Sequence, residues 1–491
     1  MKLNFQNYKD KVSACWIGKN IGGTMGTPYE GKHEMQDIQG FVTKPGEVLP
    51  NDDLDLQLVW LRALENVGPH NITAALLGEY WLTFITPHWN EYGIGKINMR
   101  RGLIPPLAGD YENSWKDSNG AWIRTEIWAC VTPGTPAAAA RYAVEDAKVD
   151  HGAGEGTYAA AFVAAMQSAA FVLSDIKECI EIAFASVPAD CRVAKTIRFA
   201  LECYAQKKDF AEARNAIQQM NADLGDGWFE APSNVAYAVL GMLYGEGDFK
   251  KSMILAINCG DDTDCTGATV GATLGILGGM KAIPKDWMEY LGDDIVTISI
   301  ARGSAARNLP NTCTDLTEKV VRLTASALLA NRSEVELTDG CDEIPEDASE
   351  RMMKALRTDE KYSATMKYLK PYSMHFDGVV YDAYVTLQKA PDIAPMGECR
   401  VDIAFVNKDF QHENEPFNLS MRWILPEGFV VESGRYTLRN DHRNAHTLTG
   451  TNVASFVIRA GETVAPTNRL VLEVVMDGRP SALYIPIILL G

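Results

Sequence analysis

The hydrophobic pattern of this chain changes its period once, and that change constrains the fold more than any other feature. In residues 1 to about 330, alanine, leucine and helical periodicity dominate, and glycine and proline gather at the breaks. Beyond residue 373, apolar and polar residues alternate in short runs, which is typical of strands that bury one face. The sequence therefore predicts a large all-α domain followed by a small all-β domain.

Within the helical part, the segment 158–172 is apolar almost all round, which predicts a helix buried on several sides. Further helices are expected at 54–67, 136–147, 176–184, 192–206, 235–244 and 267–279. The segment 86–128 is rich in loop residues and holds four tryptophans. These tryptophans either line an aromatic wall over a site or pack the loops down.

Four alternating runs lie at 379–387, 399–405, 418–424 and 470–475. They predict a β-sandwich over residues 371–491, because a sandwich of this kind needs about 100 residues. Residues 331–370 are charged and are expected to form a linker and a short helix, which leaves residues 1–330 for the all-α domain. The β domain holds no cluster of acids or histidines, so we expect an accessory role for it.

Composition limits the partners. With 46 basic and 64 acidic side chains the net charge is -18, which repels nucleic acid and anionic membrane surfaces. The sequence has no apolar run of the roughly 18 residues that a membrane span needs, and its start does not resemble a signal peptide. Ten cysteines occur without Cys-x-x-Cys spacing. These features predict a cytoplasmic protein with reduced thiols and neither a nucleic-acid nor a membrane partner.

Two acid clusters each stand at the start of a helical pattern. Asp52 and Asp53 precede the first helix, and Asp262 and Asp264 precede the small-residue helix at 267–279. One aspartate is explained as a helix cap, whereas adjacent carboxylates repel one another unless a cation neutralises them. Oxygen donors of this type favour magnesium, manganese or calcium. The alternative is two independently capped helices with spare surface acids.

Taken in order, the motifs resemble the ADP-ribosylglycohydrolase family, of the dinitrogenase reductase-activating glycohydrolase type. The glycine-rich segment 22–31, which contains Glu30, looks like the family's opening segment. Asn-Asp-Asp-Leu at 51–54 is similar to its Thr-Asp-Asp-Thr, and Gly-Asp-Asp-Thr-Asp-Cys at 260–265 to its Gly-Gly-Asp-Thr-Asp-Thr. The segments 119–124 and around His151 lie between them in the family's order. The resemblance covers roughly residues 10–284 and leaves the β domain out.

The resemblance implies an all-α domain with two divalent metal ions, magnesium or alternatively manganese. The positions that match metal ligands are Asn51, Asp52, Asp53, Asp262, Asp264 and Cys265. Glu30 matches an acid implicated in catalysis, and Asp53 is expected as the second catalytic acid. The implied reaction is hydrolysis of a glycosidic bond to ADP-ribose or a related ribosyl group, on a small molecule or an ADP-ribosylated protein.

Three positions depart from the family pattern. Asn51 and Leu54 replace threonines of the first motif, and Cys265 stands where the family has a hydroxyl ligand. An amide oxygen still suits a hard cation, whereas a thiol is a softer donor. The departures affect the expected substrate more than the expected fold.

Residues between the two acid clusters are candidates for substrate binding. They are Asn119, Trp122, His151, Glu155 and Trp228, and Asp226 and Asn234 lie in the same stretch as Trp228. For each one, a purely structural role in loop packing or helix capping is the alternative. Two other functions also stay open. The protein is either a glycosidase for a sugar other than ADP-ribose, or a non-catalytic relative like certain lens crystallins.

Overall fold

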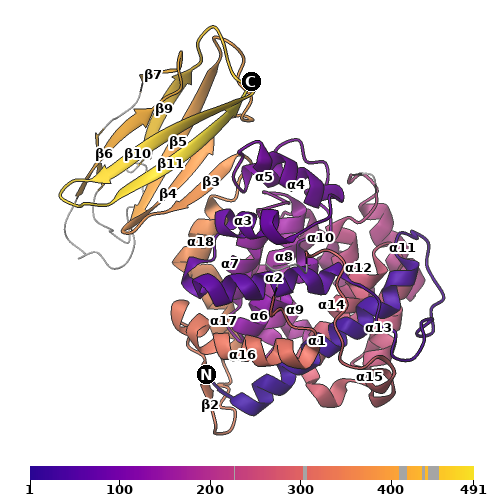
Figure 1. Ribbon diagram of the computed structural model, residues 1–491. Helices are drawn as coiled ribbons and strands as arrows, with labels where there is room; N and C mark the ends of the chain where they lie inside the picture. Colours follow the sequence, from indigo (N-terminus) through magenta and orange to yellow (C-terminus); the bar gives the residue numbers. More distant parts are fainter. Residues whose placement is uncertain (226, 302–306, 408–416, 434–436, 441–452) are drawn as a thin grey trace. The chain divides into compact units, whose positions relative to one another are not determined.

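In this computed structural model of the chain, residues 1–225, 227–301, 307–407, 417–433, 437–440 and 453–491 are described. They divide into two compact units. The first combines Met1–Lys96 with Asn113–Met366, and the second combines Ile97–Glu112 with Lys367–Gly491. Figure 1 shows helices throughout the first unit and sheets in the second.

The first unit is helical, as expected. The α-helices in chain order are α1 (Phe5–Gly26), α2 (Asp52–Val67), α3 (Ala74–Phe84), α4 (Asn90–Arg100), α5 (Leu107–Asp110), α6 (Glu126–Val131), α7 (Pro136–Ala147), α8 (Glu155–Ala170), α9 (Ile176–Ala183), α10 (Arg192–Ala205), α11 (Phe210–Met220), α12 (Ala231–Gly245), α13 (Phe249–Asn258), α14 (Thr263–Gly278), α15 (Lys285–Leu291), α16 (Cys313–Ala330), α17 (Ala348–Thr358) and α18 (Glu360–Lys367). Helix α5 and the end of α4 belong to the second unit. A short parallel pair, β1 (Lys2–Asn4) and β2 (Glu336–Thr338), joins the two ends of this unit.

Most expected helices lie where the pattern predicted them, and α8 is buried on nearly every side. The description of 86–128 as loop was wrong at Asn90–Arg100, which forms α4. Gly95 hid this helix from a propensity argument. A Cβ atom added there would lie 3.1 Å from the carbonyl oxygen of Val149, so the glycine serves close packing.

The expected linker is more ordered than its composition indicated. Two helices, α17 and α18, replace the single short helix that we predicted for 331–370. Helix α17 buries Met352 and Leu356 and packs against α7 and α9. Charged and polar residues outnumber the few apolar residues of its buried face, so the composition of this stretch concealed the helix.

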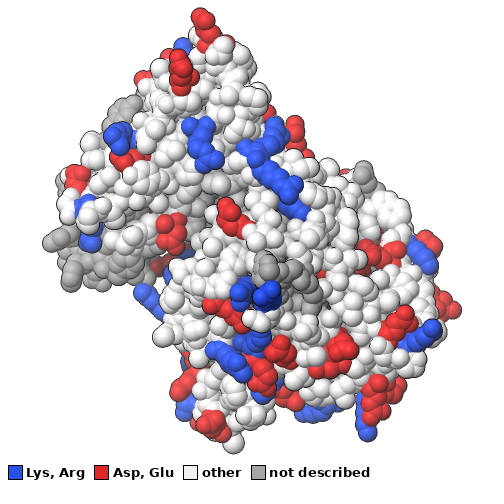
Figure 2. All heavy atoms as spheres, in the orientation of Figure 1, with Lys and Arg blue, Asp and Glu red and all other residues white. Residues whose placement is uncertain are grey.

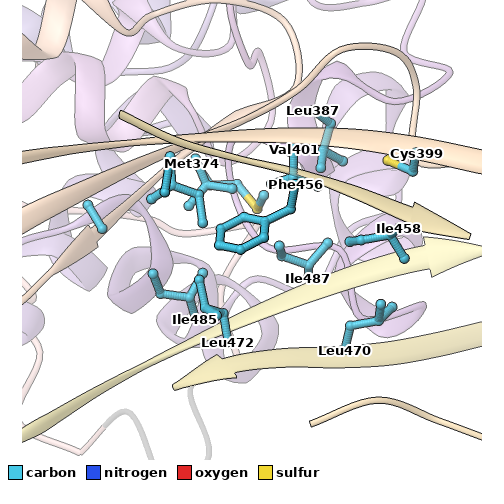
Figure 3. Close-up of a cluster of buried hydrophobic side chains, with 14 of the residues drawn as sticks. Met374, Leu387, Cys399, Val401, Phe456, Ile458, Leu470, Leu472, Ile485 and Ile487 are labelled. Atoms are coloured by element: carbon cyan, nitrogen blue, oxygen red, sulfur yellow. The ribbon is translucent and has the colours of Figure 1, made fainter. Parts of the chain in front are cut away.

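The second unit contains two antiparallel sheets. The strands are β3 (Ser373–Asp377), β4 (Tyr381–Leu387), β5 (Glu398–Asn407), β6 (Phe417–Ile424), β7 (Val430–Ser433), β8 (Thr437–Asn440), β9 (Val453–Arg459), β10 (Thr467–Met476) and β11 (Ala482–Leu490). Their orders are β3-β4-β5-β9-β7 and β11-β10-β6-β8. Val401 and Phe456 of one sheet share a core with Leu472 and Ile485 of the other (Figure 3), which is the packing of a sandwich.

A segment from far earlier in the sequence completes this core. Leu103, Leu107 and Tyr111 are buried with the strand residues, and the Tyr111 hydroxyl donates to Asp392 over 2.6 Å. The second unit therefore includes 97–112 in addition to the stretch that begins near residue 371.

No helix in the described residues is long and apolar enough to cross a membrane. All ten cysteines are free, and only Cys341 is exposed. The expectation of reduced core thiols agrees with this arrangement.

Candidate active site

Helices α1 and α14 pack closer together than side chains normally allow. Gly18 and Gly22 of α1 face Gly271 and Gly267 of α14, respectively, so the two helices run antiparallel. A Cβ atom added to Gly22 would lie 2.1 Å from the carbonyl oxygen of Gly267. Only glycine permits that approach. The antiparallel pairing brings the end of α1 beside the start of α14, where the second acid cluster lies.

Backbone hydrogen bonds join the segment after α1 to the loop before α14. Gly31 N donates to Asp261 O over 2.8 Å, and Asp261 N donates to Lys32 O over 2.7 Å. Gly260 has a φ of 77°, and a side chain there would meet the Lys32 carbonyl oxygen. These bonds hold Glu30 next to the second acid cluster.

The first acid cluster is positioned by a helix cap. The Asn51 side-chain oxygen accepts from Asp53 N over 2.7 Å and starts α2. Gly23 of α1 lacks the Cβ that would collide with the Asn51 amide group. The Tyr92 hydroxyl donates to Asp52 Oδ2 over 2.9 Å. Asn51 thus fixes the turn that carries both aspartates, and its expected role as a metal ligand stays a prediction.

The two clusters meet in two overlapping groups. Donor atoms of Asp53, Asp264 and Cys265 lie within 4.8 Å of one another, as do those of Glu30, Asp262 and Asp264. One buried carboxylate oxygen on each of Asp53, Asp262 and Asp264 accepts no hydrogen bond from a described residue. Such oxygens are costly to bury without a partner, and a hard divalent cation satisfies them. The donor set therefore fits two cations with Asp264 shared.

The acids raise one another's pKa values. Asp264 and then burial raise the pKa of Glu30 to about 8, and burial and then Asp264 raise the pKa of Asp52 to about 6. Burial is also the main reason why the pKa values of Asp53 and Asp262 lie well above the ordinary value. Without cations, the site therefore holds protons instead of full negative charge.

One buried lysine offsets part of this charge. Lys19 of α1 is 1% exposed and lies 3.7 Å from Asp53 and 3.1 Å from Glu126. Its ammonium group also donates to Ile123 O over 2.7 Å. We missed Lys19 in the sequence, although a lysine between apolar residues of a helix is a usable signal for a buried ion pair.

The Cys265 thiol donates a hydrogen bond to an aspartate. Its Sγ lies 3.3 Å from Asp53 Oδ1. Burial, followed by the charge of Asp262, raises the pKa of Cys265 well above its ordinary value. A neutral thiol is a weak ligand for magnesium, so Cys265 suits a hard cation less well than the carboxylates of Asp53 and Asp264 do.

Asn119 and Trp122 form a hydrogen-bonded pair next to the acids. The Asn119 amide donates to Asp262 Oδ2 over 2.7 Å, and Trp122 Nε1 donates to Asn119 Oδ1 over 2.9 Å. Trp122 has no exposed surface. The pair orients Asp262, which is a different role from the substrate contact that we predicted for Trp122.

His151 and Glu155 are also engaged by the protein. His151 is fully buried, with Asp150 2.9 Å from Nδ1 and Ser118 3.2 Å from Nε2. The Glu155 carboxylate accepts from the backbone N–H groups of Arg192 and Val193, each over 2.9 Å, and caps α10. These contacts match the structural roles that we gave for His151 and Glu155 as the alternative to substrate binding.

The tryptophans of 86–128 divide into two kinds. Trp122 and Trp128 are fully buried, and the Trp128 ring stacks on Trp60 in the core. Trp89 is 46% exposed. Of the two alternatives, packing describes Trp122 and Trp128, whose rings fill the space between helices, and Trp115 is half-buried.

Asn234 ties the second acid cluster to α12. Its amide nitrogen donates to Asp261 Oδ2 over 2.8 Å, and its amide oxygen accepts from Asp262 N over 3.3 Å. Asp261 also accepts from Phe229 N, and the neighbouring Trp228 is 39% exposed beside His33. Trp228 lines a cavity together with Asp261, and its expected contact with substrate stays a prediction. Asp226 lies outside the described residues.

A cavity of about 580 Å³ borders Asp261. It is lined by residues of α11 and α12 and by Trp228, His33 and Asp261. On the face shown in Figure 2, acidic and basic side chains are interspersed.

Comparison with known proteins gives three likenesses. An uncharacterised protein of Archaeoglobus fulgidus is 27% identical over 308 residues, which cover 58% of this chain and 92% of that protein. A solved structure described as an ADP-ribosylglycohydrolase-related protein complex is 20% identical with a TM-score of 0.45, and covers 66% of this chain and 99% of that one. A yeast GGA1 GAE domain is 11% identical with a TM-score of 0.17, over 24% of this chain and 99% of that one.

Neither structural likeness carries an argument at these scores, so the assignment rests on the sequence profile of a family. The profile described as ADP-ribosylglycohydrolase matches residues 4–327. That match runs from the start of α1 almost to the end of α16 and includes every acid of the site. The chain therefore belongs to the ADP-ribosylglycohydrolase family.

Proposed function

We propose that this protein is a divalent-metal-dependent glycosyl hydrolase that cleaves the glycosidic bond to ADP-ribose or a related ribosyl group. One observation carries the proposal. Asp264 is shared by two groups of acids, and buried oxygens of Asp53, Asp262 and Asp264 have no hydrogen-bond partner among the described residues. A purely structural acid cluster would satisfy these oxygens with protein donors.

The chain's residues divide into ligands and a proton donor. Asp53 and Asp264 would hold one cation, and Asp262 and Asp264 the other, which leaves the nearby Glu30 as the proton donor. Bound there, magnesium or manganese would polarise oxygen atoms and lower the pKa of water. Asp52, held by Tyr92, lies in the same buried turn of α2 and is the remaining candidate ligand.

Glu30 is the exposed member of the set, so it is the acid that a substrate can reach. In the proposed reaction, the Glu30 carboxyl group gives its proton to the leaving atom as the bond from that atom to the anomeric carbon breaks. A water oxygen forms the new bond to that carbon and loses a proton, which restores Glu30. Asp53 is fully buried, which suits a ligand better than a proton donor to substrate.

The reaction is tested with full-length protein on peptides mono-ADP-ribosylated on arginine or serine, with magnesium or manganese present. We expect metal-dependent release of ADP-ribose. Glu30→Gln should lower kcat by about 100-fold or more, which is the usual contribution of a general acid. Glu34→Gln is the matched control, because Glu34 is exposed on the same segment but is not in the acid groups.

The two alternative functions predict different results in that experiment. A glycosidase for another sugar would leave the peptides intact and cleave a neutral glycoside. A non-catalytic relative would cleave neither, even with metal bound. The complete set of five acids, Glu30, Asp52, Asp53, Asp262 and Asp264, supports an enzyme, because a non-catalytic protein has no need to bury carboxylate oxygens that accept no hydrogen bond, as Asp53, Asp262 and Asp264 each do.

A further inference from the structure

The cavity beside the acids has a polar lining of unusual composition. Asp261 forms part of its wall and is the residue next to Asp262 of the acid groups. The cavity's volume of about 580 Å³ is suited to a small organic group. Side-chain amides of α11 and the ring of Trp228 line it as well.

A buried arginine sets the direction of two of these amides. Arg214 is 2% exposed, and its guanidinium donates to Asn215 Oδ1 over 3.1 Å and to Gln218 Oε1 over 2.6 Å. Because both amide oxygens accept from Arg214, the two NH2 groups remain as donors. Arg214 also donates to Cys259 O, so its buried guanidinium group is already bonded to protein acceptors.

The cavity also contains hydrogen-bond acceptors, which are carboxylates. Asp261 and Glu230 line the cavity, whereas the described lining residues include no lysine or arginine. The His33 ring also lines the cavity, but it lies 3.5 Å from Asp261. A phosphate in this cavity would therefore lose hydration without gaining a lysine or arginine, and it would face carboxylates. A sugar hydroxyl both donates and accepts, so it pairs with the carboxylates and with the amide NH2 groups.

We propose that this cavity binds a neutral sugar that carries no phosphate, as the leaving group of the substrate. This inference rests on the proposed function, because it places the sugar next to the bond that the acids would cleave. Trp228, which is 39% exposed, offers an apolar face to the sugar ring. The substrate then carries the ADP-ribosyl or related ribosyl group at the acids and a neutral sugar, as its leaving group, in the cavity.

Binding is measured by calorimetry on full-length protein with manganese present. The probes are two matched pairs, trehalose with trehalose 6-phosphate and sucrose with sucrose 6-phosphate, together with ADP-ribose and inosine. We expect at least one neutral disaccharide to bind about tenfold more tightly than its phosphate. Trp228→Ala should weaken that binding about tenfold, which is the effect of losing one aromatic stacking contact. Tyr484→Ala, an exposed aromatic in the second unit, should leave it unchanged.

A gain of function separates charge from folding. Gln219 is exposed on the cavity wall, so Gln219→Lys should fold normally and bring the phosphate's affinity up to that of the neutral sugar. The proposal is overturned if neither neutral disaccharide binds, if ADP-ribose or inosine binds more tightly in a Trp228-dependent way, or if Trp228→Ala has no effect. Manganese binding is recorded in the same titrations, so a defective acid site is distinguished from an incorrect sugar assignment.

Discussion

At the residue scale, the acids could be predicted from the sequence but their surroundings could not. Adjacent aspartates before two helices indicated Asp53 and Asp264, because uncompensated like charges are rare without a reason. The contact of His151 with Ser118 joins residues 33 positions apart, which local sequence does not encode. Lys19 was missed for the same reason, since its partners lie on other helices.

Lys19 gives the first prediction. Lys19→Met removes the only described cation within 4 Å of Asp53 and leaves Glu126 buried with less compensation. We expect the metal-free protein to lose about 3 to 5 kcal/mol of unfolding free energy, as when one partner of a buried ion pair is removed. Urea unfolding measures it. Lys9 lies on the same helix as Lys19 and pairs with Glu318 near the surface, so Lys9→Met should cost at most about 1 kcal/mol. Equal losses in the two variants would contradict the buried role of Lys19.

Cation binding should depend on pH. In metal-free protein the pKa of Asp52 is raised to about 6 and that of Glu30 to about 8, so protons compete with cations below these values. Manganese affinity should therefore rise from pH 5.5 to pH 8.5, with protons released on binding. The raised pKa values also mean that the metal-free fold loses stability as pH rises through this window. Calorimetry in buffers of different ionisation enthalpy measures the released protons, and pH-independent affinity would contradict this account.

At the element scale, the site depends on how two helices pair. The acids of α14 follow a loop, and Glu30 follows α1, so the α1–α14 contact decides whether they meet. Helix periods located α7 to within a residue, yet the sequence reading did not list α1 among the helices. Gly22 belongs to the glycine-rich segment 22–31, and Gly267 and Gly271 to the small-residue helix at 267–279. The four-residue spacing of Gly18 with Gly22 and of Gly267 with Gly271 is the signal for a close helix pair that the sequence analysis did not use.

The pairing is tested by adding one carbon. In Gly22→Ala the new Cβ would lie 2.1 Å from Gly267 O, so the helices must separate. We expect a loss of about 1 to 3 kcal/mol or more in unfolding free energy and weaker manganese binding, because α14, which carries Asp264, shifts relative to the other acids. Gly40→Ala is the control, since a Cβ there meets nothing within 4 Å. Wild-type manganese affinity in Gly22→Ala would contradict the dependence of the site on this contact.

At the scale of the whole molecule, alternating runs predicted the sandwich, but no local pattern could show that 97–112 joins it. Leu103 and Leu107 look like ordinary apolar residues of a helical domain, and only the three-dimensional structure shows them in the β core. The sandwich is thus built from two distant stretches of chain, and a boundary near residue 370 does not separate the units cleanly.

Truncation tests this organisation. A chain that ends at residue 370 leaves Leu103, Leu107 and Tyr111 without their buried environment. We expect it to aggregate because it exposes an apolar patch. The same truncation with Leu103→Lys and Leu107→Lys should be soluble. Size-exclusion chromatography compares the two, and a soluble monomeric truncation with the native leucines would show that the 97–112 segment does not need the strands.

The central claim is that α1, α2 and α14 assemble a site for two divalent cations around Asp264. The most direct measurement is calorimetric titration of metal-free, full-length protein with manganese, for wild type and Asp264→Asn. We expect two manganese ions per wild-type chain and a large loss of affinity for both in Asp264→Asn, because this carboxylate belongs to both acid groups. No saturable binding by the wild type, or unchanged binding by Asp264→Asn, would contradict it.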